Sequence, residues 1–101
     1  MDIFKIFVEL TFYLAEGTMQ PKEYNVSYRA TFTIRGNNYT GEIEFVEKFR
    51  ITQGDAHIKA NIIFPFRNII DQNVSIGDKF TFCEGSKTLG EGIILKIYDP
   101  T

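Results

Sequence analysis

The chain has 101 residues, with eleven Lys and Arg, thirteen Asp and Glu, and a formal net charge of −2. This length predicts one domain, residues 1–101, and leaves no room for a separate catalytic domain beside it. The acidic balance argues against binding nucleic acid through bulk charge, so RNA binding would need a local basic patch. An aromatic fraction of 15% predicts an ordered fold.

Cys83 is the only cysteine, which excludes an intrachain disulfide and a zinc site built from cysteines. Asp2 and Glu9 interrupt the pattern of a signal peptide at the N-terminus. No apolar run approaches the ~20 residues that a helix needs to span a bilayer. We therefore expect a cytoplasmic protein without a membrane partner.

The first predicted strand covers residues 3–14, where apolar and mostly polar side chains alternate with period two. A loop with Gly17 and Pro21 follows. The second strand, within SYRATFTIRGNNYTG at 27–41, sets Tyr28, Ala30, Phe32 and Ile34 against Arg29, Thr31, Thr33 and Arg35. Asn37 and Asn38 are expected to turn the chain into a third strand, residues 39–45, with Thr40, Glu42 and Glu44 facing outward.

The fourth predicted strand is HIKANIIF, residues 57–64, which Pro65 ends because proline cannot donate to a ladder. Residues 66–78 are expected to be irregular and to close with Gly77 and Asp78. Phe80 and Phe82 mark a fifth strand, residues 84–87 a turn, and residues 89–98 a sixth strand. Short strands at this spacing predict an all-β domain, either a closed barrel or a sandwich.

Residues that could support catalysis have plainer explanations. His57 is expected on the outward face of the fourth strand, with no Ser or Cys nucleophile assigned to it. The glycines of residues 85–92 lack the Lys and Ser/Thr of a phosphate loop and are attributed to a hairpin. Glu42 and Glu44 are attributed to a solvated strand face. We predict no enzyme activity, no cofactor and no metal site.

Two surface features remain. The Arg29, Thr31, Thr33 and Arg35 face has side chains suited to phosphate and sugar contacts, although a solvated strand face has the same composition. NIIFPFRNII, residues 61–70, holds more apolar side chains than one straight strand can point inward. Either the chain folds back over the end of the barrel, or this segment exposes an apolar patch for a partner.

Four motifs in order resemble the C-terminal domain (domain 3) of elongation factor Tu. They are the VELTFYL strand with the AEGTMQP loop, SYRATFTIRGNNYTG, GDAHIKANIIFPF, and GDKFTFCEGSKTLGEGIILKI. The resemblance covers about residues 6–98. It implies a six-stranded antiparallel β-barrel without catalytic residues, and in the family this domain binds aminoacyl-tRNA, the GTPase domain and the nucleotide-exchange factor. None of these motifs belongs to a GTPase domain, so GTP hydrolysis is not carried over.

The family's tRNA-facing positions match in part. Arg29, Thr40 and the Glu84-Gly85 pair match the family motif, whereas Thr31 replaces a glutamine and Lys87 replaces an arginine. Cys83 replaces another arginine, and residues 17–21 lack the family's Arg and His. The RNA-facing set predicted from the basic strand face and the family positions together is Arg29, Thr31, Arg35, Thr40, Glu84, Gly85 and Lys87. A cysteine thiol cannot replace the paired hydrogen bonds that an arginine guanidinium donates to a phosphate, so tRNA binding is expected to be weakened.

Three hypotheses follow. The first is a stand-alone, non-enzymatic interaction or accessory module with a partner in the translation machinery. The second is a weak tRNA- or RNA-binding protein that uses the RNA-facing set. The third is a structural or homo-oligomeric protein that associates through residues 61–70. The protein-interface residues predicted for that segment are Ile63, Phe66, Ile69 and Ile70.

Overall fold

A computed structural model describes residues 3–13, 27–46, 57–65 and 74–98. These ranges contain six β-strands: β1 (Phe4–Phe12), β2 (Ser27–Ile34), β3 (Asn37–Phe45), β4 (Ile58–Phe64), β5 (Lys79–Glu84) and β6 (Lys87–Ile97). Among the described residues there is no helix that could cross a membrane. The predicted loop at residues 15–25, Leu14, and the side chains of Phe66, Ile69 and Ile70 lie outside the described residues.

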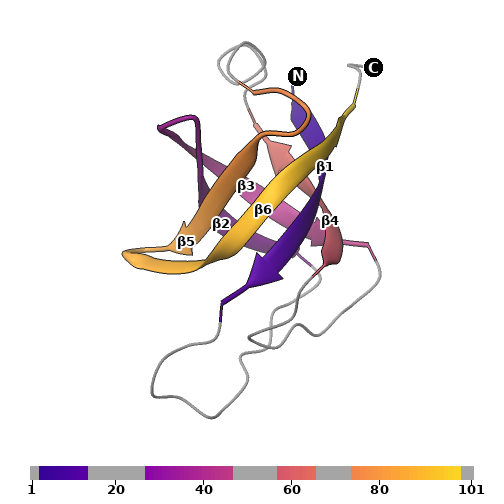
Figure 1. Ribbon diagram of the computed structural model, residues 1–101. Helices are drawn as coiled ribbons and strands as arrows, with labels where there is room; N and C mark the ends of the chain where they lie inside the picture. The colour runs from indigo at the N-terminus through magenta and orange to yellow at the C-terminus, as the bar shows by residue number, and fades with distance from the viewer. Residues whose placement is uncertain (1–2, 14–26, 47–56, 66–73, 99–101) are drawn as a thin grey trace.

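The six strands form a closed antiparallel barrel in the order β1-β4-β3-β2-β5-β6 (Figure 1). Closure depends on β1, which pairs with β4 on one side and with β6 on the other. The predicted all-β, six-stranded antiparallel β-barrel is confirmed, and the barrel replaces the sandwich as the architecture.

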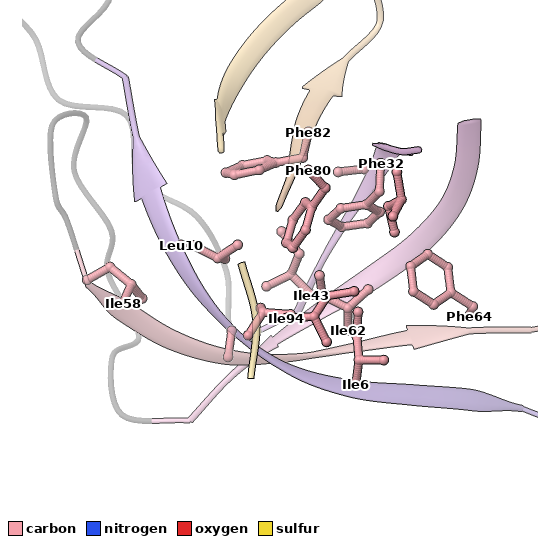
Figure 2. Close-up of a cluster of buried hydrophobic side chains, with 14 of the residues drawn as sticks. Ile6, Leu10, Phe32, Ile43, Ile58, Ile62, Phe64, Phe80, Phe82 and Ile94 are labelled. Carbon is pink, nitrogen blue, oxygen red and sulfur yellow. The ribbon is translucent and has the colours of Figure 1, made fainter. Parts of the chain in front are cut away.

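The core follows from the period-two pattern. Alternate residues of β1 are buried and half-buried along its whole length, and β4 shows the same alternation. Aromatic rings fill the interior, with Phe32 centred 5.6 Å from Phe64 and 5.8 Å from Phe80 in edge-to-face contacts. Figure 2 shows these rings beside the isoleucines of β1, β3, β4 and β6.

Glycines in β6 make room for two of these rings. Gly90 is paired with Phe82 and Gly92 with Phe80 across the β5–β6 ladder. A Cβ at Gly90 would lie 2.1 Å from the carbonyl oxygen of Thr11, and one at Gly92 would lie 2.5 Å from the Phe80 ring. The attribution of these glycines to a hairpin is confirmed, because β5 and β6 pair as one. Gly85 occupies its turn, whereas Gly90 and Gly92 are strand residues whose missing side chains permit close packing.

The β2–β3 turn also differs from the prediction. Arg35 and Gly36 are the two turn residues, with φ of 51° and 80°, whereas Asn37 and Asn38 already belong to β3. Two positive φ values fit a type I′ turn, whose twist matches that of the flanking strands. The predicted turn between β5 and β6 is confirmed, with Gly85 at φ 60°.

The fourth strand ends at Phe64, before Pro65, as predicted. Its inward face is confirmed, and Ile63 lies on the outward face, only partly buried. His57 precedes the strand instead of lying on it, and its φ of 60° explains why the extended backbone begins one residue later. Residues 74–78, the described part of the segment predicted to be irregular, contain no strand, and a turn at Ile76 and Gly77 lies just before β5.

Candidate interaction surface

Thr31 is at the centre of the predicted RNA-facing surface. It pairs with Thr40 of β3 on one side and with Cys83 of β5 on the other. Arg29 is on the same outward face of β2, two residues earlier, and is exposed. The barrel thus brings Arg29, Thr31 and Thr40 together, although they come from two strands.

The β5–β6 hairpin extends toward this cluster. Because β5 runs antiparallel to β2, the residues after Cys83 continue past Thr31 toward the level of Arg29. Glu84 and Lys87 close the hairpin as a register pair around Gly85. All of the predicted RNA-facing residues except Arg35 therefore lie toward the same end of the neighbouring strands β3, β2, β5 and β6.

Arg35 is separate from this group. It follows Arg29 by six positions, which in an extended strand is about 20 Å at ~3.3 Å per residue. Its Nε lies 2.9 Å from Oδ2 of Asp78, and its Nη2 donates to Oδ1 of Asp78 at 3.2 Å and to the Ser75 hydroxyl at 3.3 Å. The guanidinium fixes the turn before β5 and is already occupied by a carboxylate.

A carboxylate also stands beside Arg29. Glu42 of β3 is the register partner of Arg29, and both side chains are exposed on the outer face. Ile63 of β4 is the next residue in the same row, as the partner of Glu42. An anion directly beside the cation weakens the attraction of this row for a phosphate backbone.

A shallow depression of about 280 Å³ opens at this row. It is lined by Ile3, Arg29, Thr40, Gly41, Glu42, Ile63 and Pro65. Ile3 is 45% exposed at its edge. The predicted RNA-facing and protein-facing surfaces thus meet here, through Arg29 and Thr40 on one side and Ile63 on the other.

The residues considered for catalysis, His57 and Cys83, have different neighbours and do not form a common site. Cys83 has Thr31 and Thr88 as its register partners, whereas the His57 ring nitrogen Nδ1 is 2.9 Å from Oε1 of Glu9. Within the described ranges no group of three or more His, Cys, Asp or Glu residues could hold a metal ion. Hydrogen bonds from Lys59 and then His57 hold the pKa of Glu9 below its ordinary value, which marks a surface ion cluster.

Sequence reasoning missed Glu42, Ile3 and Pro65 as parts of this surface. The row that joins Arg29, Glu42 and Ile63 depends on strand register. A two-residue turn placed at Arg35 and Gly36 would have predicted that Glu42 lies opposite Arg29, because a hairpin turn sets which residues face each other. Ile3 carried no signal, because its partner strand is distant in sequence.

The chain is similar in sequence to a known translation factor. The chain is 33% identical over 104 aligned residues to the apicoplast elongation factor Tu of Plasmodium falciparum (isolate 3D7). The alignment covers 96% of this chain and 24% of that protein, so the chain spans about a quarter of its relative. No protein-family model matches the chain. The chain is thus a β-barrel with distant similarity to a translation factor.

Proposed function

We propose that this chain is a non-enzymatic binding module of the same kind as the C-terminal barrel of elongation factor Tu, with a protein partner in the translation machinery. Two observations support the assignment. The identity of 33% extends over 96% of the chain, and the closed six-stranded barrel is the fold that the resemblance implies. The alignment covers only 24% of the relative, so the proposal does not extend to the activities of the rest of that protein.

The lining of the depression beside Glu42 is the reason for proposing a protein partner instead of RNA. Ile3, Ile63 and Pro65 supply apolar surface, whereas Arg29 and Glu42 supply opposite charges one strand apart. Protein interfaces combine an apolar centre with a polar rim in this way. A site for a phosphate backbone would instead concentrate positive charge.

Capture from a cell extract tests this function. The tagged protein is incubated with a bacterial extract with and without ribonuclease, and bound proteins are compared for the wild type, Ile63→Asp and the control Ile76→Asp. Ile76 is 65% exposed in the turn before β5, away from the depression. We expect the wild type to capture a protein of the translation machinery even after ribonuclease treatment. The Ile63→Asp variant should no longer capture this protein, whereas Ile76→Asp should still capture it. Equal capture by both variants would contradict the depression as the interface.

RNA binding is the second candidate function, and the convergence of Arg29, Thr31, Thr40 and Lys87 on one side of the barrel favours it. Titration of labelled tRNA at 50 and 200 mM salt tests it, since neutralising each phosphate contributes a salt slope of about −0.9. Arg29→Glu should weaken binding and reduce the slope, whereas Lys79→Glu, at the start of β5, should not.

Self-association through residues 61–70 stays a prediction. Within the described residues of this segment, Ile63 is outward and borders the depression. Sedimentation of the wild type and of Ile63→Asp tests it: a dimer that the variant dissolves supports self-association. A monomer at every concentration excludes it.

A further inference from the structure

Two lysines share one aromatic ring where β1 and β6 meet. The Nζ atoms of Lys5 and Lys96 each lie 5.1 Å from the centre of the Tyr98 ring. The Tyr98 N–H donates to the carbonyl oxygen of Lys5 at 3.0 Å, which joins the start of β1 to the residue after β6. Figure 1 shows these two strands side by side, with the start of β1 and the end of β6 at the same end of the barrel.

The ring is fixed by a chain of hydrogen bonds. Its hydroxyl donates to Oδ1 of Asn61 on β4 at 3.1 Å, and Nδ2 of Asn61 donates to Glu44 on β3 at 3.4 Å. The first bond ties the ring edge to β4, on the other side of β1 from β6, so the position of the ring is set from two sides. A fixed ring reduces the conformational entropy that the lysines would lose on binding a ligand.

Contact with a ring holds an ammonium group without neutralising it. Lys59 shows the contrast, because its charge is balanced by Glu9. Neither Lys5 nor Lys96 makes an ion pair within the part of the chain that the structure describes. Two positive charges therefore stand close together on the surface of a protein whose net charge is negative.

Apolar side chains lie beside these charges. The β1–β6 register shifts at Phe7 and Val8, where Phe7 pairs with Lys96 and Val8 with Ile94. Leu95 is the extra residue of this bulge and is 38% exposed. Phe7 is half-buried on the outward face. Bulges often redirect a side chain in this way, and here the result is an apolar strip next to a cationic pair.

We propose that the Lys5–Tyr98–Lys96 cluster binds an acidic segment of a protein partner, with carboxylates on the two ammonium groups and an apolar side chain against Phe7 and Leu95. Charge complementarity selects the acidic ligand. Glu44 and Glu9 lie on the same outer surface and would repel a continuous phosphate backbone. Carboxylates spaced along a peptide can avoid them.

Binding of an acidic segment at this cluster does not depend on the proposed function. It adjoins the depression through the Lys5 and Ile63 register pair, but its test needs no translation partner. If the peptide does not bind, the capture result from the cell extract is unaffected. If capture fails, the peptide result is likewise unaffected.

Fluorescence anisotropy with the purified chain tests the proposal. The probes are a labelled peptide of alternating glutamate and leucine, a labelled uridine oligonucleotide, and vesicles of phosphatidylserine and phosphatidylcholine. We expect the peptide to bind at least roughly tenfold more tightly than the oligonucleotide, and the vesicles not to bind. Tighter binding of the oligonucleotide or the vesicles, or no binding of the peptide, would overturn the proposal.

Paired variants assign the effect to the cluster. Lys5→Glu with Lys96→Glu should abolish peptide binding, whereas Lys79→Glu with Lys87→Glu makes the same change of charge elsewhere and should retain it. Tyr98→Leu leaves both lysines but removes the ring, and we expect a loss of roughly fivefold to tenfold. Tyr98→Phe keeps the ring and loses the hydrogen bond to Asn61, so it should bind more weakly than the wild type but more tightly than Tyr98→Leu. Equal losses in both lysine pairs would show that net charge alone attracts the peptide.

Circular dichroism establishes that each variant is folded. If the glutamate pair does not fold, Lys5→Gln with Lys96→Gln removes the same two charges without adding carboxylates. Peptide binding that persists in a folded glutamine pair would overturn the assignment.

Discussion

Glu9 shows how a single outward-facing side chain can link pH to stability. Lys59 and His57 both contact its carboxylate, so its pKa lies below the ordinary value of 4.5. A carboxyl group whose pKa is lower in the folded than in the unfolded chain stabilises the fold above the unfolded pKa. That stabilisation is lost as the pH falls through the folded pKa.

We therefore expect Glu9→Gln to lower the free energy of unfolding at pH 7. The difference from the wild type should shrink as the pH falls below 4.5. Urea titrations at several pH values measure it, with Glu42→Gln as a control carboxylate on another strand. A difference that stays constant down to acidic pH would mean that the variant acts through packing instead of charge.

Among the described glycines, Gly90 leaves the least room for a side chain. An added Cβ would meet backbone atoms, the Thr11 oxygen at 2.1 Å and Cα of Phe12 at 3.1 Å. At Gly92 the nearest atom, at 2.5 Å, belongs to the Phe80 side chain. Side chains can move at lower cost than paired strands can.

Gly90→Ala should therefore destabilise the barrel by about 3 kcal/mol or more, and Gly92→Ala by about 1–3 kcal/mol. Thermal and urea unfolding of both variants, beside the exposed control Thr88→Ala, measure the order. The reverse order would contradict the packing of β1 against β6.

At the scale of elements, the turns decide which surface residues meet. Alternation alone placed the inward side chains of β1, β2 and β4 correctly, because burial repeats with period two in a sheet. The turn residues were harder, because Gly-Asn-Asn allows more than one two-residue turn. A turn at Asn37 and Asn38 would place Arg29 opposite Val46, whereas the observed turn places it opposite Glu42. Because the turn was predicted two residues too late, the sequence analysis did not place the Glu42 carboxylate beside Arg29.

The turn before β5 gives a prediction about Arg35 and Asp78. The ion pair is partly exposed, so it should contribute at most about 1 kcal/mol. Asp78 also accepts the Ser75 N–H at 2.8 Å, and this bond holds the turn itself. Asp78→Ala should therefore cost more stability than Arg35→Ala, by about 0.5–1.5 kcal/mol.

Urea unfolding of both single variants and of the double variant checks this difference. The double variant should be about as stable as Asp78→Ala, because the ion pair is already lost in that single variant. Equal costs for the two single variants would mean that the turn does not depend on the carboxylate.

At the scale of the whole molecule, the sequence pattern predicted the barrel and part of the candidate surface. Strand number, inward faces and the resemblance to elongation factor Tu agreed on one fold. The Lys5, Lys96 and Tyr98 cluster could not be predicted in the same way. It depends on the register between the first and last strands, about 90 residues apart, and on a bulge that no turn residue marks.

The same long-range pairing predicts the order of folding. The β2–β3 hairpin joins neighbouring residues, whereas β1 finds its partners only in β4 and β6. Because closing long loops costs entropy before the contacts form, we expect β1 to dock late. Val8→Ala should accelerate unfolding and hardly change the folding rate, whereas Ile43→Val, in β3, should slow folding. Stopped-flow refolding followed by tyrosine fluorescence measures both rates. If Val8→Ala slowed folding as strongly as it destabilised the protein, β1 would belong to the folding nucleus, and barrel closure would be an early event.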